Sequence, residues 1–174
     1  MTAPDSTVRA PTHVIARRYL VIANRTTDSD TLRAALLERA ARGPAEFVVM
    51  VPVPQLVNAA LATLATDPVG GIIYSLPISE AEEAEELDYA QQRLDALVNF
   101  LSASGGTASG WITRSDPITA TDDALSDGRF DEIVISTFPA GLSRWLKMDL
   151  PCRLKRRASI PVVHVEATAE AAQV

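Results

Sequence analysis

The sequence contains a single cysteine, Cys152, so an internal disulfide is excluded, which fits a reducing cytoplasm. No apolar run approaches the roughly 20 residues that a transmembrane helix requires. The first 17 residues lack the continuous apolar core of a secretion signal. Lys and Arg number 16 against 22 Asp and Glu, and the resulting net charge of −6 argues against general affinity for nucleic acid or anionic membranes. We therefore expect a cytoplasmic protein that binds neither.

Glycine-rich nucleotide fingerprints are also missing, since neither a phosphate loop nor a dinucleotide-binding pattern occurs. A serine nucleophile requires an activating base and an oxyanion site. Neither histidine is near Ser136 in the sequence: His13 is in the expected leader, and His164 is inside an expected strand, where packing is its more common role. No catalytic residue is assigned, and we expect the protein not to be an enzyme.

Short apolar runs alternate with helical patterns along most of the chain. A length of 174 residues with 47% hydrophobic residues suits one domain with one core. Strands are predicted over 19–23, 47–51, 111–113, 133–135 and 162–165. Helices are predicted from 28–30 to 42, over 56–65, 79–102 and 117–128, and from about 149. This alternation predicts an α/β domain, an open, doubly wound five-stranded parallel sheet, over 18–166, with a flexible leader over 1–17 and a flexible tail over 167–174.

The segment from Ile133 to Val165 carries a specific resemblance. Its order of strand, loop, helix and strand resembles the end of a universal stress protein domain, within the adenine nucleotide α-hydrolase-like superfamily. In that family the loop reads Gly, two residues, Gly, nine residues, then Gly followed by Ser or Thr. The corresponding positions here are Ser136, Pro139, Asp149 and Leu150.

These replacements remove the features that hold a phosphate, namely free backbone N–H groups and close approach of the chain. Pro139 has no N–H to donate. Asp149 would place a carboxylate where the family receives phosphate, and an acid at a helix start is itself favourable. We hypothesise that Asp149 substitutes for the phosphate, so that ATP binding is weak or absent.

The resemblance also implies a ligand site at the carboxyl ends of the first and fourth strands, and the nucleotide-binding positions would be Asn24, Val51, Ser136, Thr137, Gly141, Ser143 and Arg144. Asn24 stands where the family usually carries an aspartate. An amide can hydrogen-bond a ligand, but Asn after a strand is also typical of a turn, which is the favoured interpretation. No cofactor is assigned, and ATP, ADP or another adenine nucleotide stays open as a ligand.

Other features admit a functional and a structural interpretation. The basic side chains are either an anion site or the solvated face of a helix that buries leucines, and the second is favoured; they are Arg144, Lys147, Arg153, Lys155, Arg156 and Arg157. Cys152 is expected to be buried and inert. The resemblance implies a homodimer through the edge strand 161–165.

The resulting prediction is a stress-related binding or interaction module. The alternatives are a true nucleotide binder with an altered loop and, further off, an enzyme of the α-hydrolase-like group.

Overall fold

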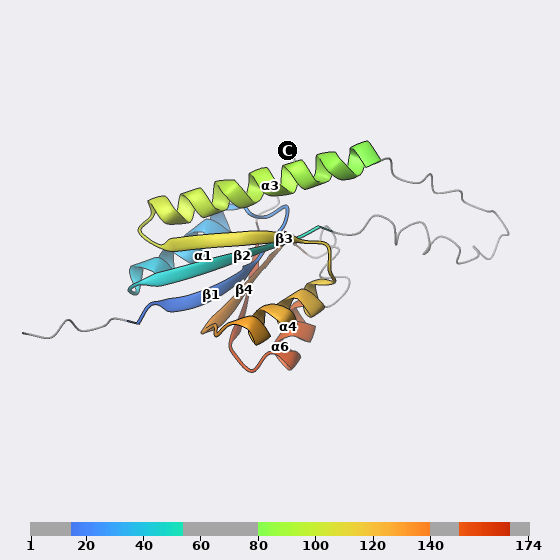
Figure 1. Cartoon of the computed structure of the whole chain (residues 1–174). Helices are drawn as coiled ribbons and strands as arrows, with labels where there is room; N and C mark the ends of the chain where they lie inside the picture. The colour runs from blue at the N-terminus through green and yellow to red at the C-terminus, as the bar shows by residue number, and fades with distance from the viewer. Residues whose placement is uncertain (1–14, 54–79, 140–149, 168–174) are drawn as a thin grey trace, which may run out of the picture.

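The computed structural model describes residues 15–53, 80–139 and 150–167 (Figure 1). Along the chain the elements are β1 (Arg17–Ile22), α1 (Asp30–Ala41), β2 (Ala45–Pro52), α3 (Glu80–Ala103), β3 (Thr107–Thr113), α4 (Pro117–Asp127), β4 (Glu132–Thr137), α6 (Leu150–Arg157) and β5 (Val162–Glu166). The helix expected over 56–65 and most of the expected leader and tail lie outside the described residues.

The strands form one parallel sheet in the order β3-β2-β1-β4-β5. The predicted open, doubly wound five-stranded sheet is therefore confirmed. β3 starts four residues before the predicted strand, at Thr107 rather than Trp111. The prediction left out residues 107–110 because most of them are exposed and the strand contains no continuous apolar run. The sheet pairing also reaches Arg17 and Ala167, one residue beyond each expected domain limit.

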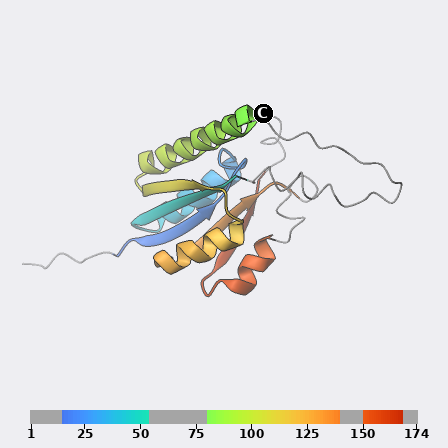
Figure 2. The same ribbon diagram turned by 45° about the vertical axis from the view of Figure 1, so that its right-hand side comes forward.

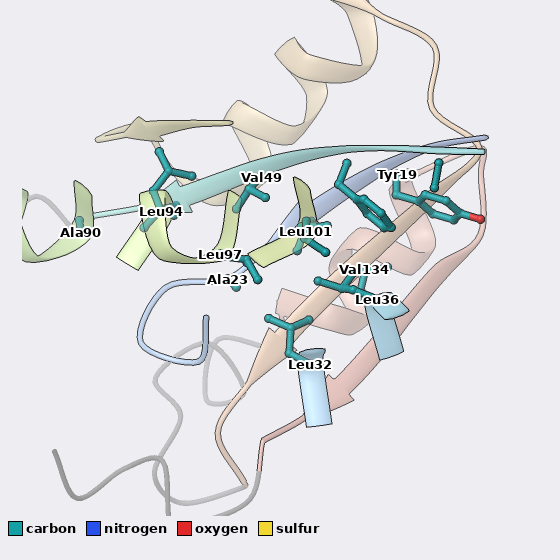
Figure 3. Packing of buried hydrophobic residues seen from close by; sticks show 14 of the residues in the cluster. Tyr19, Ala23, Leu32, Leu36, Val49, Ala90, Leu94, Leu97, Leu101 and Val134 are labelled. Atoms are coloured by element: carbon teal, nitrogen blue, oxygen red, sulfur yellow. The ribbon is translucent and has the colours of Figure 1, made fainter. Parts of the chain in front are cut away.

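Helices cover both faces of the sheet. In Figures 1 and 2, α1 and α3 lie on one face, and α4 and α6 lie on the other. Because successive residues of a strand point to opposite faces, β1 sends Tyr19 and Val21 into the core under α1 and α3, and Leu20 and Ile22 into the core under α4 and α6. Figure 3 shows Tyr19, Leu36, Leu101 and Val134 in this core, where the ring of Tyr19 stacks on that of Phe47 with 5.3 Å between the ring centroids. Burial on both faces explains why the central strands are continuous apolar runs.

Local signals set the helix starts. Asp116 caps α4, because its carboxylate accepts hydrogen bonds from the N–H groups of Ile118 (3.1 Å) and Thr119 (3.3 Å), and Pro117 occupies the first turn. Ser29 is the N-cap residue of α1, within the range 28–30 predicted for the start of this helix. Its hydroxyl does not cap the backbone, because it pairs with the hydroxyl of Thr31 at 2.7 Å. Across the described part of the chain, no helix is both long and apolar enough to span a membrane.

Candidate functional site

The carboxyl ends of β1 and β4 lie side by side at the centre of the sheet, where Ile22 pairs with Ile135. From β1 the chain continues to α1 on one face, and beyond β4 lies α6 on the other. Connections that diverge in this way leave a crevice outside the strand ends, the usual ligand site of open α/β sheets. The fold therefore selects this position before any side chain is considered.

Hydroxyl side chains gather at these strand ends. Thr26 and Thr27 follow β1, Ser136 and Thr137 end β4, and all four residues are buried. Among the described residues, the hydroxyl oxygens of Thr26, Thr27 and Ser136 have no hydrogen-bond partner. A buried polar group left without a partner costs about 1–3 kcal/mol. Three hydroxyl groups at these strand ends are therefore buried and lack a hydrogen-bond partner within the described residues.

The side-chain amide and the backbone carbonyl of Asn24 both form hydrogen bonds within the protein. Its Nδ2 donates to the carbonyl of Pro52 at 2.7 Å, and its Oδ1 accepts from Nη1 of Arg93 at 3.3 Å. Its backbone carbonyl accepts from the N–H of Thr27 at 3.3 Å, as expected for a turn. Asn24 thus joins the end of β1 to the end of β2 and to α3. The sequence predicted the turn at Asn24 but not the side-chain contacts with Pro52 and Arg93.

Thr137 contacts a histidine that is distant in the sequence. Its Oγ1 lies 2.7 Å from Nε2 of His164 and 3.0 Å from the carbonyl of Phe138, to which it donates. Burial lowers the pKa of His164; the charge of Lys155 acts in the same direction, and that of Glu166 opposes it. Burial therefore favours the neutral form of the ring. Its place next to Thr137 follows from the pairing of His164 with Ile135, a register that only the folded sheet supplies.

A further contact connects the start of α1 with the end of β5. The hydroxyl of Thr31 donates to the carbonyl of Glu166 at 3.1 Å, and the N–H of Ala167 donates to the carbonyl of Thr137 at 2.8 Å. These bonds hold the ends of β4 and β5 and the start of α1 together beside the hydroxyl cluster of Thr26, Thr27 and Ser136. Sequence analysis placed no such role on Thr31.

The remaining predicted positions divide into two groups. Val51 is fully buried in the core on the α1 and α3 face and has no polar side chain to offer. Four further positions lie outside the described residues, namely Gly141, Ser143, Arg144 and Asp149. The hypothesis that Asp149 substitutes for the phosphate therefore stays a prediction.

On α6, Leu150 and Leu154 are buried and the basic side chains are exposed; those side chains are Arg153, Lys155, Arg156 and Arg157. The interpretation as a solvated helix face is confirmed for this helix, where Arg157 pairs with Asp122 at 2.7 Å. The expected burial of Cys152 is wrong, because the residue lies on the exposed side of α6. In the described segments no group of three or more His, Cys, Asp or Glu side chains is placed to hold a metal ion.

The sheet order and the helix layers define a doubly wound α/β domain, and solved structures share it. A universal stress protein from Archaeoglobus fulgidus is 15% identical and superposes with a TM-score of 0.52 over 87% of this chain and 94% of its own. A universal stress protein family protein from Arabidopsis thaliana, solved with AMP bound, is 15% identical, with a TM-score of 0.55 over 88% and 94%. This chain therefore has the universal stress protein fold. No family model matches the sequence, and no curated protein matches it.

Proposed function

We propose that this protein is a non-catalytic binding or interaction module built on the universal stress protein fold. Its ligand site is the hydroxyl cluster of Thr26, Thr27 and Ser136 where β1 and β4 end. The observation that carries the proposal is the burial of three hydroxyl oxygens without partners in the described chain. A polar ligand that hydrogen-bonds to them would remove their desolvation cost, whereas an apolar one would not.

We also propose that triphosphate binding at this site is weak or absent. Pro139 stands at a position where the family's loop has glycine, and it lacks the N–H that a phosphate needs. The Asp149 hypothesis adds a carboxylate repelling the same phosphate. Asn24, which replaces the family's usual aspartate, already bonds to Pro52 and Arg93. Each of these features disfavours ATP more than a smaller polar ligand.

The proposal of a non-catalytic role is supported by the surroundings of Ser136. Within the described residues its Oγ has no hydrogen-bond partner that could act as a base. The one histidine described at these strand ends, His164, bonds to Thr137 instead. A nucleophilic serine needs a base at hydrogen-bond distance.

A second candidate function is the binding of a mononucleotide such as AMP at the same cluster. The Arabidopsis protein with this fold was solved with AMP bound. A nucleoside monophosphate offers ribose hydroxyls and only one phosphate, so it depends less on the loop that contains Pro139. This candidate shares the site and differs in the ligand.

Titration calorimetry with AMP and with ATP separates these two functions. The melting temperature is an independent readout, because a ligand selective for the native state raises the melting temperature. The proposal expects no ATP binding tighter than about 1 mM. AMP binding that Ser136→Ala and Thr26→Val weaken about tenfold, and that Thr119→Val on the exposed side of α4 leaves unchanged, would establish the second candidate. Micromolar ATP binding, or turnover of an adenylated substrate lost in Ser136→Ala, contradicts the main proposal.

We further propose a homodimer through β5. This strand forms one edge of the sheet, pairs with β4 on one side only, and exposes Val163. Edge strands with free backbone groups readily pair with a second chain. Light scattering should give the dimer mass, and Val163→Lys should give the monomer mass. A wild-type monomer at a concentration of about 100 µM would refute the dimer.

A further inference from the structure

A concavity lies between α4 and the edge strand β3, and no residue of the hydroxyl cluster at the ends of β1 and β4 lines it. It has a volume of about 320 Å³. Its inner surface is formed by Val48 of β2 together with Ala120 and Ala124 of α4. The two alanines on the buried side of α4 leave room that larger side chains would fill. A groove of this volume suits a small molecule.

The α4 side of the groove carries negative charge. Asp123 and Asp127 lie one helical turn apart, both are exposed, and the structure gives neither an ion pair in the described chain. The neighbouring Asp122 differs, because it pairs with Arg157. The lining residue with positive charge is Arg18, which bonds to Glu46 at 3.0 Å and stacks over Phe130 at 4.7 Å. Its charge is therefore already compensated, and two carboxylates are left for a ligand.

The sheet contributes an indole ring to the lining of the groove. Trp111 of β3 is half-buried and lines the groove from the sheet. The face of an indole ring attracts cations, and the attraction grows as water is excluded. A positive group in the groove would thus meet the carboxylates and the indole, while a short carbon chain would cover Val48 and the alanines.

From this combination we propose that the groove between α4 and β3 binds a small organic cation, a guanidinium or ammonium group on a short aliphatic chain. The charge balance selects a cation, and the apolar floor favours one with a carbon chain over a bare metal ion. The proposal does not depend on the strand-end site, because the two share no residue.

Agmatine, which carries a guanidinium and an ammonium group on a short chain, is the probe. The sequence contains two tryptophans, so Trp145→Phe leaves Trp111 as the sole indole reporter. Agmatine should change its fluorescence saturably, with a matching calorimetric Kd on the wild-type chain. Asp123→Asn with Asp127→Asn should weaken binding about tenfold, and Trp111→Leu, measured by calorimetry, about threefold to tenfold.

The matched control is Asp88→Asn with Asp95→Asn, which removes the same charge from the exposed side of α3 on the other face of the sheet. It should change the Kd by less than about twofold. Equal weakening in both double variants would mean unspecific charge attraction and overturn the proposal. So would equal binding of uncharged butyramide, or no saturation in the wild type up to about 10 mM agmatine. Ser136→Ala should leave the agmatine Kd unchanged, which separates this result from that of the strand-end site.

Discussion

Thr137 and His164 lie side by side at the ends of β4 and β5, with 2.7 Å between the hydroxyl oxygen and Nε2. They are 27 residues apart in the sequence. The contact makes the one described histidine part of the surroundings of the candidate site. Because burial lowers the pKa of His164, this residue connects the folding equilibrium to pH.

Lowering the pH should destabilise the protein through His164. Its pKa in the folded state is below the unfolded value of about 6.5, so the unfolded chain takes up the proton first. The stability that neutral His164 contributes is complete above about pH 6.5 and is lost as the pH falls through the folded-state pKa. Chemical denaturation at a series of pH values measures this loss. In His164→Gln the slope of the unfolding free energy against pH should decrease in this window, and an unchanged slope would contradict the prediction.

Removing Glu132 should strongly destabilise the fold. Its carboxylate accepts hydrogen bonds from Nε and Nη2 of Arg39, and the side chains of the two residues are only 14% and 6% exposed. Glu132→Ala leaves a buried guanidinium without its partner, which should cost about 3–5 kcal/mol of unfolding free energy. Glu38→Ala is the control, because Glu38 of α1 pairs with the C-cap residue Arg42 while 65% exposed, and should cost about 0.5 kcal/mol or less. Similar losses in the two variants would contradict this.

Gly110→Ala should destabilise the packing of α3 on the sheet. A Cβ atom at this position would clash with the carbonyl oxygen of Val49 and lie 2.6 Å from Cδ1 of Leu94. Neither backbone nor a packed leucine yields without strain, so the loss should be about 1–3 kcal/mol. The neighbouring Ser109→Ala, on an exposed residue of the same strand, should have little effect in the same denaturant titration.

Asn24→Ala should weaken the connection between the ends of β1 and β2. The substitution removes the bond to the Pro52 carbonyl and the acceptor for Arg93, which should cost about 1–2 kcal/mol. Asn99→Ala, on the exposed side of α3, serves as the control and should change the unfolding free energy by less than about 0.5 kcal/mol. An Asn24→Ala variant as stable as the wild type would show that these contacts contribute nothing.

Replacing two buried threonines by valine should change the unfolding free energy differently, because only one of them forms a hydrogen bond through its hydroxyl. Thr27 has no partner for its hydroxyl in the described chain, whereas the equally buried Thr121 donates to the carbonyl of Pro117 at 2.6 Å. In the free protein, Thr27→Val should therefore leave the unfolding free energy unchanged or raise it, and Thr121→Val should lower it by about 1 kcal/mol. Equal losses in both variants would show that Thr27 is already satisfied and would remove the basis of the proposed ligand site.

The sequence predicted the parts of the site that depend on neighbouring residues. The runs before Asn24 and Ser136 marked buried strands, and the alternation of strands and helices brought their ends to one edge. Contacts between distant segments were not predictable in this way. The bonds of Arg93 to Asn24 and of His164 to Thr137 depend on strand register and helix placement, for which neither residue carries a local signal. The groove at Trp111 likewise depends on how α4 packs beside β3.

Taken alone, the sequence determined which segments become strands and helices and that the sheet is parallel, because apolar periodicity, caps and turn residues act over a few neighbouring positions. Tertiary structure decided which hydroxyls lose their water, which polar groups find partners and which carboxylates line the same groove as an indole. Those outcomes depend on side chains far apart in the chain and meet only when the sheet and its two helical layers pack together.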